Sequence, residues 1–452
     1  MKSILRGRRL ITLMLLLFLT GMIVLVVRIQ MEASFYISQS GKPCYGMVYD
    51  REGDVLFDGI NGCEGYESGH FADIGSLIGD TSGQMTNTLV ARNLESLTNY
   101  SFTTGMRQTG KTAIHTTLDH AANKATYSAF GKKDGIAIAY NYKTGEMLVN
   151  VSKPCVDVAK GYGDIANFPE GSLLCKAFYG TVPGSTQKVS TVIAATEILG
   201  AEQLESLSYS CTGSYLNDNR QSINCHKSSG HGKQNIFQGF ANSCNPFFAQ
   251  LLERSGMPLD RIISVYRSMG YAVNGDQKQT ISIDGILSET ASTTLQDIHD
   301  FDTQWGCMGQ GETLVSPCQL MMWQSAVANG TGVSTRPHLI DTVTNVSGKV
   351  TKTASTEYTG QLFSVAAAQE TRKIMLDNGK NHYAAAGKIK GYDIAVKSGT
   401  AQVNGGREEN SLLVGFVDDP DFPIAFCVVI ENRVSGEIAT HQIVQKMLDA
   451  LK

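Results

Sequence analysis

The sequence predicts a mixed α/β domain, with a sheet between layers of helices, attached to one membrane-spanning helix. Three observations predict this architecture. An apolar run without a charged residue covers residues 10–27, strand-like patterns occur at both ends of the region 112–452, and helix-like patterns lie between those strands. Strands that enclose helices along the chain are typical of a sheet flanked by helical layers. With 452 residues, the chain is long enough for one large domain and a smaller one.

The apolar run at residues 10–27 has the length of a membrane-spanning helix, since about 18 helical residues cover about 27 Å. Four basic residues and no acidic residue precede it: Lys2, Arg6, Arg8 and Arg9. We therefore expect a cytoplasmic tail at 1–9, a signal anchor at 10–29 and a remainder outside the cytoplasm, with a single crossing. A cleaved signal peptide is the alternative, but residues 28–32 offer no small-x-small cleavage site.

The elements after the anchor fall into two regions. Residues 30–111 are rich in Gly, Ser, Thr and Asn, with a strand–turn–strand pattern at 47–56, and indicate a small juxtamembrane module. From residue 112 the patterns are firmer and predict the main domain, 112–452. The predicted helices cover 118–130, 186–199 and 246–255, and the predicted strands cover 136–140, 146–151, 394–397 and 424–431.

Charge and cysteine content exclude some classes of function. The net charge is −4, so we expect no nucleic-acid partner. None of the ten cysteines forms a Cys-x-x-Cys pair, and the spacing of Cys225, His226 and His231 fits no zinc template, so we expect no metal and no other cofactor. Cys211 and Cys225 flank a short polar loop and could either form a disulfide or stay unpaired.

The first chemical motif is Pro183-Gly184-Ser185-Thr186-Gln187-Lys188. Ser185 is predicted to open a helix, and Lys188 lies one turn later on the same face, within reach of the hydroxyl. A serine beside a base, at a helix start with unpaired N–H groups, is the arrangement that a nucleophilic serine needs. The alternative is that Ser185 only caps the helix. This is the only Ser-x-x-Lys tetrad in the chain.

The second motif is Ser243-Cys244-Asn245, which directly precedes a predicted helix. Here a hydroxyl can relay a proton and an amide can hold a substrate. A similar triplet, Ser222-Ile223-Asn224, is followed by no helix start, so we interpret it as part of a polar loop.

The third motif is Lys397-Ser398-Gly399-Thr400, at the end of an apolar strand. An ammonium and two hydroxyls can bind a carboxylate, and Gly399 lets a peptide backbone approach the strand edge. The similar Lys143-Thr144-Gly145 precedes the serine motif and is explained by a tight turn between two strands.

The three motifs in this order resemble those of β-lactamases and penicillin-binding proteins. Further segments are similar to landmarks of class B penicillin-binding proteins: Asp119, Thr144-Gly145-Glu146, Val151-Ser152-Lys153-Pro154, His231-Gly232, Gly309-Gln310-Gly311 and Glu431-Asn432. This resemblance covers residues 112–452. It implies a β-lactamase/transpeptidase-like fold, with an antiparallel sheet of about five strands flanked by helices, and a single-pass bacterial membrane protein with its catalytic domain outside the cytoplasm.

The resemblance also implies an activity: cross-linking of peptidoglycan in the cell wall. Ser185 is expected to attack the D-alanyl-D-alanine bond of a stem peptide, with Lys188 as base, Ser243 as proton relay and Asn245 holding the substrate amide. Lys397, Ser398, Gly399 and Thr400 are expected to bind the terminal carboxylate, and the backbone N–H groups of Ser185 and Thr400 to form the oxyanion hole. β-Lactam antibiotics are expected to acylate Ser185, and a SEDS-family glycan polymerase is the expected protein partner.

Three alternatives remain open at this point. A D,D-carboxypeptidase would use water as the acceptor, and a β-lactamase or β-lactam sensor would hydrolyse or retain the drug. A scaffold without activity would not need Ser185 at all. The discriminating observations are the products formed from stem peptides and the lifetime of the acyl-enzyme.

Overall fold

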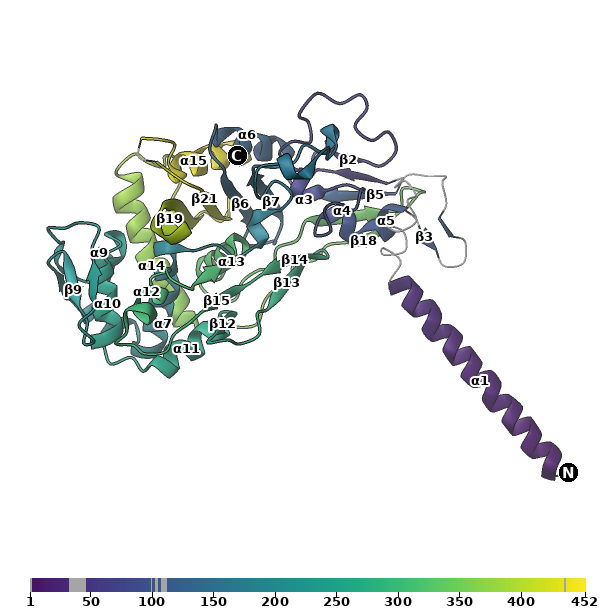
Figure 1. Ribbon diagram of the computed structural model, residues 1–452, viewed down its shortest axis with the longest axis horizontal. Coiled ribbons are helices and arrows are strands. Elements are labelled where there is room, and N and C mark those ends of the chain that lie inside the picture. The colour runs from purple at the N-terminus through teal and green to yellow at the C-terminus, as the bar shows by residue number, and fades with distance from the viewer. Residues whose placement is uncertain (1, 32–45, 99, 102–104, 107–111, 435) are drawn as a thin grey trace.

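The computed structural model describes residues 2–31, 46–98, 100–101, 105–106, 112–434 and 436–452 (Figure 1). Parts of the expected juxtamembrane module therefore lie outside the described residues. Helix α1 covers Lys2–Met31 and extends away from the folded body. Its segment Arg6–Ile29 is long and apolar enough to cross a membrane, and its most apolar stretch is not buried inside the folded body. The expected spanning segment thus forms one continuous helix.

A five-stranded antiparallel sheet forms the centre of the fold. Its strand order is β19-β20-β21-β6-β7. The strands are β19 (Ile394–Val403), β20 (Glu408–Val417), β21 (Ile424–Ile430), β6 (Gly135–Asn141) and β7 (Met147–Lys153). β19 is an edge strand, and it carries the third motif.

Helices cover both faces of this sheet, so β6 and β21 are almost entirely apolar, and β20 is apolar from Leu412 onward. On β6, Ile136 and Ile138 join the larger core, whereas Ala137 and Ala139 join the smaller one. This alternation follows from the two-residue period of a strand. The smaller core lies under α6 (His120–Ala129) and α15 (Thr440–Leu451), and the larger one under α7 (Lys188–Leu199), α13 (Pro317–Ala328) and α14 (Val365–Gly379).

A second sheet combines strands from distant parts of the sequence. Its order is β18-β17-β5-β1-β2. The strands are β1 (Met47–Tyr49), β2 (Val55–Asp58), β5 (Ala113–Thr116), β17 (Ile340–Thr344) and β18 (Val350–Thr353). β1 and β2 form the predicted strand–turn–strand, and β1 pairs in parallel with β5. One sheet therefore contains residues from both sides of residue 111.

A lobe of short elements lies at the opposite end of the molecule from α1 (Figure 1). It contains two ribbons, β8 (Tyr209–Cys211) with β11 (Gly232–Gln234), and β9 (Ser214–Leu216) with β10 (Ser222–Asn224). Helices α9 (Ile236–Ala241) and α10 (Asn245–Arg254) follow, and the turn between them carries the second motif.

The other helices are α3 (Gly75–Ile78), α4 (Leu89–Arg92), α5 (Leu94–Thr98), α8 (Ala201–Ser206), α11 (Leu259–Ser268) and α12 (Phe301–Cys307). The other strands are β3 (Tyr100–Ser101), β4 (Gly105–Met106), β12 (Tyr271–Val273), β13 (Thr280–Ile283), β14 (Ile286–Glu289), β15 (Ala291–Thr293) and β16 (Leu314–Val315). Short 3-10 turns cover Val158–Lys160, Ile165–Asn167, Lys176–Phe178, Gly184–Gln187 and Asn404–Gly406, and a π-helical turn covers Lys380–Ala384.

The predicted fold class is confirmed, as are the predicted helices and strands to within a few residues. Lys143-Thr144-Gly145 forms the turn between β6 and β7, as expected. Two features differ from prediction. β19 continues to Val403 instead of ending at Lys397, because every residue of the third motif pairs with β20. β20 was not among the strands predicted from the sequence, because its first residues are polar and only the later ones are apolar.

Candidate active site

The candidate nucleophile lies on a tight turn rather than inside a helix. Ser185 belongs to the 3-10 turn Gly184–Gln187, and α7 begins directly after it. Gly184 has a φ of +52°, and a Cβ at this position would lie 2.5 Å from the backbone oxygen of Thr400. Its N–H donates to the carbonyl of Gly309 over 2.8 Å. Only glycine fits this conformation and this contact, so the turn holds Ser185 directly against β19.

Lys188 lies one turn after Ser185 and is fully buried. Its Nζ is 2.8 Å from Ser185 Oγ, 2.8 Å from the backbone oxygen of Ser243 and 2.7 Å from Asn245 Oδ1. Ser243 Oγ is 3.3 Å from the same nitrogen. Burial lowers the pKa of Lys188 to about 7, because the charged form loses its hydration. An amine with this pKa exchanges a proton readily near neutral pH.

The second motif reaches Lys188 through the turn between α9 and α10. Ser243 has a φ of +51°, which is uncommon for a residue other than glycine and directs its backbone oxygen at Lys188. Asn245 opens α10, and its Nδ2 donates to the carbonyl of Asn224 over 3.2 Å. The triplet 222–224 therefore lies beside the site, where it contributes a backbone oxygen rather than its side chains.

The third motif lies on edge strand β19. Lys397 is buried, and its Nζ donates to Ser243 Oγ over 3.0 Å and to the backbone oxygen of Ser398 over 2.7 Å. Its pKa is held well below the usual range by burial and by the neighbouring charge of Lys188. Ser398 is half-buried and Thr400 is exposed, and both follow Lys397 on the same strand.

All three motifs thus converge on one group of side chains. In the described part of the chain, neither Lys188 nor Lys397 forms an ion pair with a carboxylate. The partners of both lysines are hydroxyls, an amide oxygen and backbone oxygens, and an aromatic ring lies under each ammonium (Phe248 at 5.3 Å and Phe240 at 5.5 Å). Two buried amines without carboxylates can take up and return a proton beside a serine hydroxyl.

The sequence of the chain also matches the model of a known protein family. A family model described as "Penicillin binding protein transpeptidase domain" covers residues 135–449, which is more than two thirds of the chain. The chain belongs to this family. The matched range contains the three motifs and all five strands of the central sheet.

Individual proteins show the same relationship. Stage V sporulation protein D of Bacillus subtilis (strain 168) is 27% identical over 359 residues, which is 75% of this chain and 52% of the relative. The chain therefore spans about half the length of this curated relative. Among solved structures, the D,D-transpeptidase domain of a peptidoglycan glycosyltransferase from Eggerthella lenta matches with a TM-score of 0.73 and 21% identity, over 90% of this chain and 97% of that chain. Penicillin-binding protein A of Mycobacterium tuberculosis, in a penicillin G acyl-enzyme complex, matches with a TM-score of 0.73 and 18% identity, over 91% of this chain and 100% of that chain. Both structures share the fold of this family member.

Two contributors to the site were not assigned a role from the sequence. Gln310 Nε2 donates to the backbone oxygen of Thr400 over 3.1 Å and so fixes the strand beside Ser185. Asn224 supports Asn245 through its carbonyl. Gln310 stands in a Gly-Gln-Gly segment that resembled a family landmark, whereas a backbone carbonyl such as that of Asn224 leaves no sequence signal.

Three groups of described residues could hold a metal ion. They are Cys211 with Cys225, His231 and Cys244; Asp54 with His70 and His120; and Asp218 with Glu253 and His299. The first group includes Cys244, the middle residue of the second motif. None of the three groups includes Ser185, Lys188 or Lys397.

Proposed function

We propose that this member of the penicillin-binding protein transpeptidase family is a peptidoglycan D,D-transpeptidase that acts through an acyl-enzyme on Ser185. The observation that carries the proposal is the pair of Ser185 and Lys188. A fully buried amine with a pKa of about 7 lies 2.8 Å from a hydroxyl, and no carboxylate holds it in the charged form. A neutral amine in this position can remove the hydroxyl proton as the oxygen attacks a carbonyl.

The proton has a continuous path to the leaving group. Ser185 Oγ forms an ester with the penultimate D-alanine of the stem peptide while its proton passes to Lys188 Nζ. Ser243 Oγ lies 3.3 Å from that nitrogen and 3.0 Å from Lys397 Nζ, so it can pass the proton to the amine of the departing D-alanine. In the second step an amine of a neighbouring stem attacks the ester, the proton returns, and Ser185 is released.

Edge strand β19 supports substrate binding in the same proposal. Lys397, Ser398 and Thr400 bind the terminal carboxylate, and Gly399 leaves room for a peptide strand to pair with the edge. We place the oxyanion hole at the backbone N–H groups of Ser185 and Thr400, which is supported by the close approach of Gly184 to the Thr400 backbone. One such donor is typically worth about 3 kcal/mol of transition-state stabilisation.

The long apolar helix α1 supports a membrane arrangement for the proposed enzyme. We place residues 1–9 in the cytoplasm, the anchor at 10–29, and the module 30–111 and the catalytic domain 112–452 outside. At such a surface the enzyme meets stem peptides and β-lactams, which mimic the D-alanyl-D-alanine end. It also needs glycan strands to link, for which we propose a SEDS-family polymerase as the partner.

Product analysis tests this function. Purified protein is incubated with glycan strands whose stems end in D-alanyl-D-alanine, and digested products are separated by mass. We expect cross-linked dimers with wild-type protein and none with Ser185→Ala. Trimmed monomers alone would assign a carboxypeptidase, rapid penicillin hydrolysis would assign a β-lactamase, and full activity of Ser185→Ala would refute the acyl-enzyme.

A further inference from the structure

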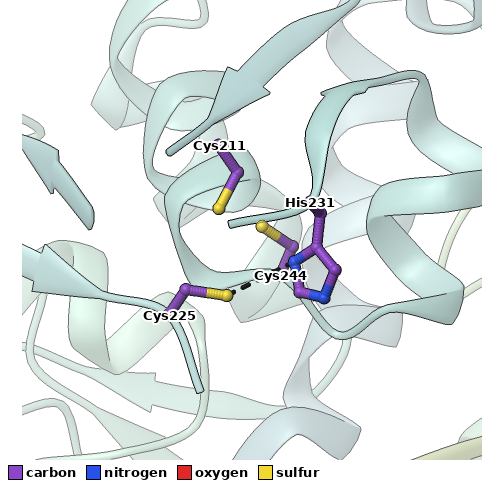
Figure 2. Close-up of side chains that lie close together, drawn as sticks. All are labelled: Cys211, Cys225, His231 and Cys244. Atoms are coloured by element: carbon purple, nitrogen blue, oxygen red, sulfur yellow. Dashed lines mark hydrogen bonds between the residues drawn. The ribbon is translucent and has the colours of Figure 1, made fainter. Parts of the chain in front are cut away.

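Three thiols and one imidazole meet in the lobe next to the active site (Figure 2). Cys211 ends β8, Cys225 follows β10, His231 precedes β11, and Cys244 caps α10. Their four donor atoms all lie within 4.8 Å of one another. Figure 2 shows the side chains of all four pointing toward one centre, with Cys225 Sγ 3.4 Å from His231 Nδ1. All three cysteines carry free thiols.

We propose that Cys211, Cys225, His231 and Cys244 bind one zinc ion as a tetrahedral Cys3His site. Thiolate and imidazole are the ligands that Zn²⁺ prefers, and with Zn–S bonds of about 2.3 Å the sulfurs of such a site lie about 3.8 Å apart. The four donor atoms, which lie within 4.8 Å of one another, need only a small approach to reach this geometry. On binding, each thiol gives up its proton, and His231 uses Nδ1, the nitrogen that faces Cys225.

The lobe gives a second, independent reason for a metal. Its two ribbons have only three residues per strand, and Cys211 and Ile223 are the only buried apolar side chains between Tyr209 and Gln234. Both side chains belong to the larger core, and Tyr209 and Tyr215 are partly buried against it, but ribbons of this length are held only weakly by their own strand pairing. A metal that joins β8, β10, β11 and α10 supplies the missing cross-links, as zinc does in other small folded units.

The position of the cluster links the metal to catalysis. Cys244 stands between Ser243 and Asn245, which both contact Lys188. Cys225 directly follows Asn224, whose carbonyl accepts a hydrogen bond from Asn245. Zinc would therefore fix two neighbouring segments of backbone and, through them, the partners of Lys188. The four ligands are positioning residues, since none of them touches the serine.

The spacing along the sequence does not reveal this site. Cys225, His226 and His231 fit no template, and His226 is not among the four ligands. The ligands become neighbours only when β8 pairs with β11 and the second motif folds against both. A disulfide between Cys211 and Cys225 would use the same thiols, and it would exclude the zinc site.

Metal content tests the proposal on the full chain purified with a thiol reductant. We expect about one zinc per chain in wild-type protein by elemental analysis. We expect the same in Cys63→Ser, the matched control, because Cys63 is exposed and outside the cluster. Cys225→Ser should lose most of the zinc. Cobalt substitution provides a second readout, since three thiolates around Co²⁺ give an intense charge-transfer absorption that Cys225→Ser should weaken.

The proposal is overturned if wild-type protein, refilled with zinc under reducing conditions, binds none, or if Cys225→Ser binds as much as wild type. Recovery of the protein from its membranes with a Cys211–Cys225 disulfide would also overturn it. The functional consequence rests on the proposed activity: removal of zinc by a chelator should slow acylation by penicillin at least tenfold. Zinc binding without any acylation would refute the proposed activity but not the zinc site. Failure of the activity can therefore be distinguished from failure of the zinc proposal.

Discussion

The active site and the junction between α6 and the β1–β2 turn each contain a fully buried side chain that can carry a positive charge. Lys188 has hydroxyls, an amide and backbone oxygens as partners, and burial lowers its pKa to about 7. His120 lies between Asp54, at 2.8 Å from Nδ1, and Asp73, at 3.4 Å from Nε2. Burial alone would lower the pKa of His120, but the hydrogen bond and charge of Asp73, together with the hydrogen bond of Asp54, outweigh burial and raise the pKa above its ordinary value of 6.5.

The difference shows that the partners of a buried cationic side chain, rather than its burial, decide whether it can transfer protons or only stabilises the fold. A carboxylate beside a buried cation keeps the proton in place and joins two segments, here α6 with the β1–β2 turn and residue 73. A buried amine without a carboxylate loses its charge near neutral pH and becomes available for proton transfer. Four predictions follow from this contrast.

Substitution of the buried lysine should give the largest effect. Lys188→Met removes the base from Ser185 and should slow acylation by penicillin by about 10²- to 10⁴-fold. The fold should persist, because no carboxylate is left unpaired. Stopped-flow acylation measures the rate, and circular dichroism measures the melting temperature. An unchanged acylation rate would assign the base to another group.

The matched change at the junction between α6 and the β1–β2 turn should have the opposite consequence. His120→Gln leaves Asp73 buried without its charged partner and should lower the free energy of unfolding by about 3 kcal/mol. Acylation of the remaining folded protein should keep its wild-type rate. Urea denaturation measures the first quantity. A variant that is stable but does not react with penicillin would contradict the distinction between the two regions.

The acylation rate of wild-type protein should depend on pH through Lys188. With a pKa of about 7, the amine is protonated below this pH and cannot accept the Ser185 proton. The rate should rise about tenfold per pH unit up to pH 7 and level off above it. A flat profile between pH 5 and 8 would mean that the base keeps one protonation state throughout.

Stability should respond to pH through His120, with a smaller effect. Because its folded pKa is raised, its stabilisation is fully present below about pH 6.5 and is lost as the pH rises through the folded pKa. The difference in unfolding free energy between wild type and His120→Gln should therefore narrow from pH 6 to pH 9. All other ionisable groups are common to both proteins, so their contributions to this difference largely cancel. A constant difference would show that His120 stabilises the fold only as a neutral side chain.

Much of the central fold could be predicted from local patterns. The β6–β7 hairpin and the starts of α7 and α10 follow from apolar periodicity and from residues such as Pro246 at the helix start. The second sheet could not be predicted, because β1 and β17 are almost 300 residues apart and short strands carry little signal about their partners. The role of His120 was missed for the same reason.

The part of the candidate site that consists of reactive side chains was predictable from the sequence motifs. Ser185, Lys188, Ser243, Asn245 and Lys397 all converge as the motifs suggested. The supporting contacts were not predictable, since the carbonyl of Asn224, the Gly184–Thr400 approach and the left-handed Ser243 are properties of the folded backbone.

Mass spectrometry of the penicillin adduct tests the central claim most directly. Purified protein is treated with penicillin, its intact mass is measured, and the modified peptide is sequenced. We predict one covalent penicilloyl group per chain, attached to Ser185, and none on Ser185→Ala. An unmodified protein, or a drug attached to any other residue, would contradict the account of Ser185 and Lys188 as nucleophile and base.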